Sequence, residues 1–213
     1  MTLNEITTLI ATNLGMEMDI PFRLQLADRV KAWRGRLIAN HLQKNPDQRR
    51  HFLQTLYVPM QRGTAASSIY SDQSKSESVF AIPQVLKIGT AKYDYLGGVD
   101  GLNPFYPVIL GTGAFMEEGR FWNKSSHYDE INNYIIVDNA FLKNIRVSAL
   151  FDDPAKVFEL ECALNNADCD AWNKDYPMSA ELTQLVIQSI LQIDYNRKDP
   201  QGETEIEVSK PKQ

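Results

Sequence analysis

The sequence contains few of the residues that usually carry metal or redox chemistry. Only two cysteines and three histidines occur among 213 residues. Cys162 and Cys169 have no second cysteine pair, and no histidine lies at zinc-ligand spacing from them. A structural zinc site needs four ligands in close pairs, so we expect no metal and no cofactor. Two cysteines cannot form a disulfide framework, and we expect small buried side chains in a reducing compartment.

Long hydrophobic runs are also missing. No stretch approaches the roughly 18 apolar residues of a membrane-spanning helix, so we expect no membrane partner. Residues 1–5 contain neither a basic region nor an apolar core, so we expect no secretory signal. The chain is nevertheless 43% hydrophobic and 23% charged, which is typical of a globular protein and excludes wholesale disorder.

Motifs of known enzyme classes are absent as well. The glycines at 111–119 do not form a dinucleotide or phosphate loop, and those at 97–101 lack the acidic ligands of a calcium loop. Residues 127–130, His-Tyr-Asp-Glu, place a base beside carboxylates, which would suit acid–base chemistry in a loop pocket. A solvated turn is the simpler interpretation. We therefore predict no catalytic residue, with an enzyme built around this segment as an open alternative.

Apolar spacing and capping signals predict helices at both ends of the chain. In the first third we expect three helices: one from the Thr2/Glu5 capping box to Gly15, one from Asp19 to about Leu42, and one from Asp47 to Tyr57, ended by Pro59. Near the C-terminus we expect a helix capped by Asp153 before Pro154 and a last helix capped by Ser179.

The middle of the sequence has a different character. Residues 63–78 are small and polar, which predicts a flexible loop. Residues 79–151 alternate short apolar runs with turn residues, which predicts strands, including 134–137 and 144–151. The predicted fold class is therefore α+β. Segments 1–62 and 152–195 form a small helical bundle, 79–151 is a β-rich and loop-rich insertion, and 196–213 is an extended C-terminal arm.

Positive charge is concentrated in one segment, although the whole chain has a net charge of −5. Residues 21–62 contain nine basic and two acidic side chains, so the remainder has a net charge of −12. Such a segment forms a solvated helix face, a nucleic-acid surface, or one half of a head-to-tail contact between subunits. The candidate interface or DNA-facing residues are Arg23, Arg29, Lys31, Arg34, Arg36, Arg49 and Arg50.

Three stretches resemble a known family. Residues 93–105 contain an aromatic–Gly–x–Val–Asp–Gly–x–x–Pro–Phe element. Residues 133–139 and 145–154 are similar to a strand pair that leads into a Phe-x-Asp-Pro helix start, and residues 175–192 are similar to a closing helix. Together they resemble the structural ring proteins of crAss-like, short-tailed bacteriophages, over most of residues 1–195.

The resemblance implies a non-enzymatic virion protein that is assembled in the cytoplasm of the bacterial host. Such proteins form a ring, typically of twelve subunits, in the neck of the virion. They act as a head-to-tail connector between the portal protein and the tail, contact adjacent ring and tail proteins, and extend the DNA channel without reading DNA sequence. Two alternatives remain open: a nucleic-acid-binding module that uses helices 21–62, and another tail or capsid component.

Overall fold

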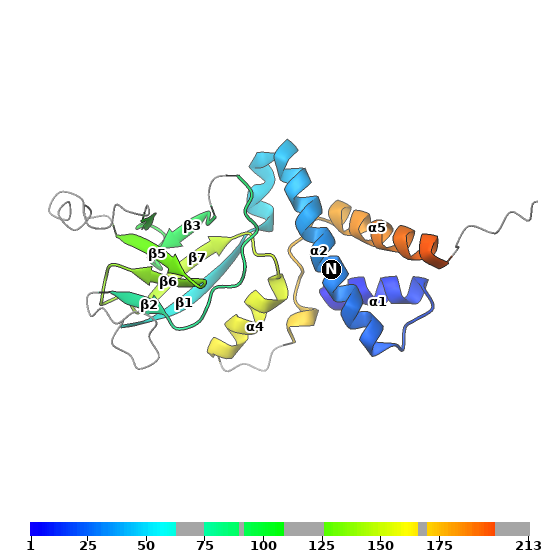
Figure 1. Ribbon diagram of the computed structural model, residues 1–213, viewed down its shortest axis with the longest axis horizontal. Helices are drawn as coiled ribbons and strands as arrows, with labels where there is room; N and C mark the ends of the chain where they lie inside the picture. Colours follow the sequence, from blue (N-terminus) through cyan, green and yellow to red (C-terminus); the bar gives the residue numbers. More distant parts are fainter. Residues whose placement is uncertain (63–74, 90–91, 109–125, 166–169, 199–213) are drawn as a thin grey trace, which may run out of the picture.

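The computed structural model describes residues 1–62, 75–89, 92–108, 126–165 and 170–198, with the side chains of 165 and 195–198 left out. A curved sheet lies at one end of the molecule and a group of helices at the other (Figure 1). The helices are α1 (Leu3–Asn13), α2 (Ile20–Lys44), α4 (Pro154–Asn165) and α5 (Ala180–Lys198), with short 3₁₀ helices η1 (Pro46–Phe52) and η2 (Ala171–Asn173). The strands are β1 (Gln54–Arg62), β2 (Ser76–Ser78), β3 (Tyr95–Gly97), β4 (Tyr106–Pro107), β5 (His127–Ile131), β6 (Tyr134–Val137) and β7 (Asn144–Ala149).

The seven strands of the described residues form one sheet in the order β3-β7-β1-β2-β6-β5-β4. All neighbours are antiparallel except β4 and β5. Strand β1 is the longest and links the two halves of the sheet, because its first part pairs with β7 and its last part with β2. Leu56, Val58 and Met60 alternate along β1 and point into the apolar interior. The sheet is thus built around a single continuous strand.

The two edges of the sheet come together at Gly97. This residue forms a bridge with Pro104, and the amide of Phe105 donates to the carbonyl oxygen of Leu96 at 2.7 Å. The sheet is therefore nearly closed. A Cβ atom at Gly97 would lie 2.2 Å from the carbonyl oxygen of Asn103, so the approach of these backbone segments requires glycine.

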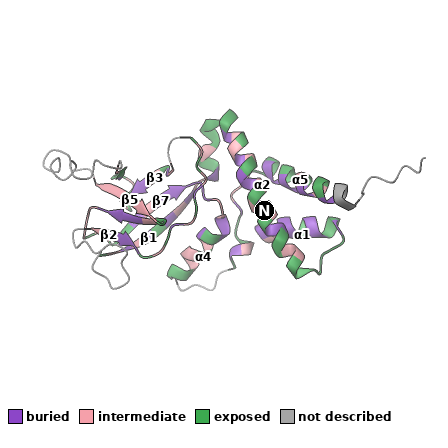
Figure 2. Ribbon diagram, viewed as in Figure 1, coloured by how far each residue is buried: buried purple, intermediate pink, exposed green. Residues whose placement is uncertain are grey.

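Helices α1, α2 and α5 share a separate apolar core at the other end of the molecule. It includes Ile6 and Ile10 of α1, Leu26 and Val30 of α2, and Val186 of α5. Figure 2 shows buried and exposed residues alternating around these helices, as expected for amphipathic segments. Each helix buries one stripe against its neighbours and leaves the other to solvent.

The predicted helix starts are confirmed. The Thr2 hydroxyl accepts from the amide of Glu5 at 3.1 Å, and the Glu5 carboxylate accepts from the amide of Thr2 at 2.9 Å. Asp19 accepts from the amide of Phe22 at 2.9 Å. Asp153 and Ser179 cap α4 and α5 in the same way, through the amides two and three residues later. Local capping chemistry thus fixes where the helices begin.

Helix α4 departs from the predicted bundle. It lies beside the sheet and contacts β1 and η2 (Figure 1). Its Val157 is 1% exposed and belongs to the sheet core, and the partly buried Leu160 packs against the same core. Only Ala155, at its start, joins the core of α1, α2 and α5. The helices near the C-terminus therefore serve two different cores.

The expected helix over 47–57 is wrong beyond Phe52. The 3₁₀ helix η1 ends there, Leu53 is extended, and residues 54–62 form β1. The apolar residues of this segment alternate at period two, as in a strand. The strand forms in place of the expected helix because β7 pairs with residues 54–59 as an antiparallel partner. Pro59, expected to end a helix, lies inside the strand. The carbonyl oxygen of Pro59 accepts from the amide of Val79, on the side away from β7. Because the nitrogen and the carbonyl group of a strand residue point to the same side, the ring nitrogen also faces away from β7. The missing N–H therefore breaks no hydrogen bond between β1 and β7.

Two other expectations change. Within the predicted flexible loop 63–78, Ser76–Ser78 form the buried strand β2, paired with β1 and β6. Residues 63–74 and the arm from 199 onward lie outside the described residues. Cys162 is half-buried and disulfide-bonded rather than a buried thiol. The only other cysteine in the sequence, Cys169, also lies outside the described residues.

The closure of the sheet predicts a difference between two adjacent glycines. We expect Gly97→Ala to lower the free energy of unfolding by about 2–4 kcal/mol, because its methyl group meets fixed backbone. Gly98→Ala is the matched control, since its methyl group meets chiefly the Asp100 carboxylate, which can rotate away. Urea unfolding followed by circular dichroism measures both. Equal losses for the two variants would contradict the proposed closure.

Candidate assembly surfaces

Most of the candidate basic residues have partners within the subunit. The Nη1 atom of Arg29 donates to both carboxylate oxygens of Asp194 of α5, at 2.7 and 2.8 Å. Lys31 contacts Asp153, the cap of α4, at 2.9 Å. These pairs join α2 to elements far along the sequence. Because the positive charges of Arg29 and Lys31 are paired with carboxylates within the chain, these side chains are less available to a partner molecule.

Two further arginines hold segments together in the same way. Arg23 donates to the side-chain oxygens of Asn4 at 2.5 Å and Thr8 at 3.0 Å, both on α1. Arg49 of η1 binds both carboxylate oxygens of Asp94, at 2.6 and 2.9 Å, and the carbonyl oxygen of Ile88 at 2.9 Å. Bidentate arginine contacts fix orientation as well as distance. These residues stabilise the subunit.

Arg34 is completely buried. Its Nη1 donates to the carbonyl oxygen of Phe151 at 2.8 Å, and Nε and Nη2 approach that of Pro177 at 3.4 Å. The guanidinium lies 5.5 Å from the centre of the Tyr176 ring. Burial lowers the pKa of Arg34, while Tyr176 and the Asp152 and Asp153 carboxylates oppose that shift. Arg34 therefore joins α2, the end of the sheet and the segment before α5.

Arg36 and Arg50 are the two members of the candidate set that are exposed. Arg36 lies over the ring of Trp33, with 5.2 Å from its guanidinium carbon to the ring centre. Five of the seven residues thus have separate hydrogen-bonding partners within the chain, one of the five, Arg34, is buried, and the set does not form one exposed face. Their internal pairs were not apparent from the sequence, because Arg29 and Asp194, for example, are 165 positions apart.

The predicted loop around His127 is also different in the structure. Residues 127–131 form strand β5 rather than a loop, because they pair with β6. Successive side chains of a strand point to opposite faces, which separates His127 from Glu130 and leaves the exposed Asp129 on the same face as His127. The His127 ring lies 6.5 Å from that of Tyr106, while Glu130 forms an ion pair with Lys92. Neither His127 nor Asp129 lines the hollow between α4 and β1 or the hollow at residues 15–19.

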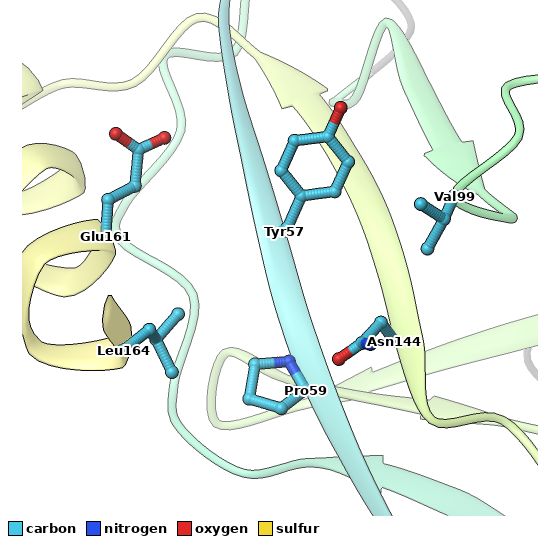
Figure 3. Close-up of a pocket in the computed structure, with 6 residues that line it drawn as sticks. All are labelled: Tyr57, Pro59, Val99, Asn144, Glu161 and Leu164. Carbon is cyan, nitrogen blue, oxygen red and sulfur yellow. The ribbon is translucent and has the colours of Figure 1, made fainter. Parts of the chain in front are cut away.

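A groove lies between α4 and the outer face of the sheet. It has a volume of about 460 Å³. Figure 3 shows Tyr57 and Pro59 on β1 at its centre, Glu161 and Leu164 from α4 on one side, and Val99 and Asn144 on the other. Tyr57, Val99 and Leu164 are 50%, 48% and 40% exposed. Three exposed apolar side chains from different parts of the sequence thus meet at one recess. We call it the α4–β1 groove.

The groove also contains one carboxylate with an altered acidity. Burial raises the pKa of Glu161, and the nearby Lys174 ammonium opposes that shift. Lys174 is exposed and lies near enough to Glu161 for the two charges to interact. Arg146 lies opposite Tyr57 in the β1–β7 ladder.

A second apolar surface lies at the turn between α1 and α2. Gly15 has a φ of 70° and ends the first helical segment, as predicted. After it, four apolar side chains stand in solvent: Met16 at 38%, Met18 at 94%, Ile20 at 69% and Leu24 at 53% exposed. The turn lies at the end of the molecule away from the sheet (Figure 1). We call these four residues the α1–α2 knob.

The position of the knob follows from the geometry of α2. Leu26 and Val30 pack into the helical core and define the buried stripe. At 100° per residue, Leu24 lies roughly 200° around the helix from Leu26, so it points outward. Asp19 starts the helix, which places Met18 just outside it with no helical neighbour to cover it. The chain therefore exposes apolar side chains here through its regular structure.

Two separate apolar surfaces on a subunit with internally paired cations are typical of a component of an assembly. A family model described as phage tail ring protein 2 matches residues 22–204, and the chain belongs to this family of crAss-like phage structural proteins. No curated protein matches the chain. The resemblance found in the sequence is thereby confirmed.

Membership of this family sets the broad role. A ring protein of a phage tail is an oligomeric, structural part of the virion, and the family is not an enzyme family. Among the residues that the structure describes, no three histidine, cysteine, aspartate or glutamate side chains are placed to hold a metal ion. No helix within the described ranges is both long enough and apolar enough to cross a membrane.

The position of Arg34 predicts a large effect of its removal. We expect Arg34→Met to lower the free energy of unfolding by about 2–4 kcal/mol, because the buried carbonyl oxygen of Phe151 and the partly buried one of Pro177 lose their donor. Arg36→Met, two positions along the same helix, is the control and should cost less than about 1 kcal/mol, since it removes only an exposed contact with Trp33. Chemical unfolding of both variants measures the difference. An Arg34→Met protein as stable as Arg36→Met would refute the internal role.

Proposed function

We propose that this protein forms one ring of the head-to-tail connector, between the portal protein and the tail, in twelve copies around the DNA channel. Family membership is the observation that carries this proposal. The two exposed apolar surfaces support it, because a closed ring needs two different complementary surfaces on every subunit.

The distribution of charge supports passage of DNA rather than its capture. Five of the seven candidate basic residues have partners or are buried within the subunit: Arg23, Arg29, Lys31, Arg34 and Arg49. The net charge of the chain is −5. A channel wall with few available cations does not release many counterions from DNA, so it binds DNA weakly. This argues for a conduit and against a nucleic-acid-binding module that uses residues 21–62.

Removal of the gene tests the connector role. A phage that lacks this protein should accumulate DNA-filled heads without tails, because the neck has no surface on which the tail can dock. Electron microscopy of lysates counts the particle types, and supplying the wild-type protein in trans should restore tailed particles. Complete tailed particles in the absence of the protein would contradict the proposal.

A further inference from the structure

The two apolar surfaces of the subunit differ in shape. The α1–α2 knob presents Met18, which is 94% exposed, although residues 15–19 also border a hollow of their own. The α4–β1 groove is recessed and lined by Tyr57, Pro59 and Leu164 (Figure 3). The knob lies at the helical end of the molecule, whereas the groove lies on the sheet and α4 (Figure 1). The exposed Met18 side chain and the apolar recess lie on different faces, so the side chain of one copy can meet the recess of another.

The charges beside the two surfaces also differ. The knob segment 16–22 contains two acidic residues, Glu17 and Asp19, and no basic one. The groove is flanked by Arg146, which lies opposite Tyr57 in the β1–β7 ladder, and by Lys174. Its own acidic lining residue, Glu161, lies close enough to the Lys174 ammonium for the two charges to interact. Opposite charges around complementary apolar surfaces orient two molecules toward each other.

Arg146 brings a positive charge to the side of the groove. It lies opposite Tyr57, a lining residue, in the β1–β7 ladder. Its guanidinium lies 5.5 Å from the centre of the Tyr95 ring, and its Nε atom is covered by the subunit itself. Arg146 therefore favours an acidic partner through its charge.

We propose that the α1–α2 knob of one subunit inserts into the α4–β1 groove of a second copy, with Met18 as its apolar anchor. The contact is head-to-tail: each subunit donates its knob to one neighbour and accepts a knob from the other. Repetition of such a contact closes into a ring when the rotation between subunits divides a full turn. This inference rests on the proposed function, because it assigns the contact between adjacent subunits of the ring.

Two single substitutions separate the halves of this contact. Met18→Arg removes the knob anchor and leaves the groove intact, and Leu164→Arg fills the groove and leaves the knob intact. Both side chains are exposed, so the fold should be retained, which circular dichroism and thermal melting check. Phe141→Arg is the matched control, because Phe141 is 80% exposed and belongs to neither surface.

Sedimentation velocity of the full chain then gives a distinctive pattern. The wild type and Phe141→Arg should associate as concentration rises, and each of the other two variants should show an apparent Kd at least tenfold weaker. An equimolar mixture of Met18→Arg and Leu164→Arg should form a 1:1 dimer that cannot grow, because the mixture retains one intact knob facing one intact groove. A self-paired interface between identical surfaces would not give this result.

Several outcomes would overturn the inference. They are a wild type that sediments as a monomer at every concentration, a Met18→Arg protein that associates like the wild type, or a mixture that stays monomeric. The first would mean that the knob and groove serve another chain. The connector role is tested separately, by counting tailed particles of the deletion phage. Failure of this contact in sedimentation is therefore distinguishable from failure of the connector role.

Discussion

The buried guanidinium of Arg34 is the contact on which the arrangement of the subunit depends. A charged group without solvent must find acceptors, and Arg34 finds them in two carbonyl oxygens, those of Phe151 and Pro177. The first lies directly after the sheet and the second directly before α5. One side chain therefore holds the helical end, the sheet end and the connection between them. A further apolar cluster, which includes Ile38 of α2, Leu150 after β7 and Leu182 of α5, joins the same elements.

This junction matters for assembly because the two exposed apolar surfaces lie on different sides of it. The knob belongs to α1 and α2, and the groove belongs to the sheet and α4 (Figure 1). In a head-to-tail contact, the angle between donor and acceptor surfaces sets the rotation from one subunit to the next. Arg34, Lys31 and Asp153 fix that angle inside each subunit. A rigid junction would thus determine how many copies complete a proposed ring.

Features that depend on local chemistry could be predicted from the sequence. The capping residues Thr2, Asp19, Asp153 and Ser179 start helices as expected, because a cap acts within one turn. The segment 47–57 could not be predicted in this way. Its apolar residues suit a helix or a strand, and only pairing with β7, almost 90 residues later, decides between them.

The candidate surfaces depend on contacts of the same long range. Tyr57, Val99 and Leu164 lie far apart in the sequence, and no spacing rule predicts that they line one groove. The excess of basic residues over 21–62 could be read from the sequence. The internal contacts of these residues could not, because their carboxylate and carbonyl partners come from other elements. Resemblance to a family supplied the role that these patterns could not. The structure shows which carboxylates pair with the basic residues and which apolar side chains remain exposed.

The most direct measurement is a cryo-electron microscopy reconstruction of the intact phage particle in which this chain can be traced. We expect a closed ring of this chain on the axis of the portal, with Met18 of each subunit against Tyr57 and Leu164 of the next. A ring with a different contact would contradict the assigned interface alone. Absence of the chain from the neck and tail would contradict the account as a whole.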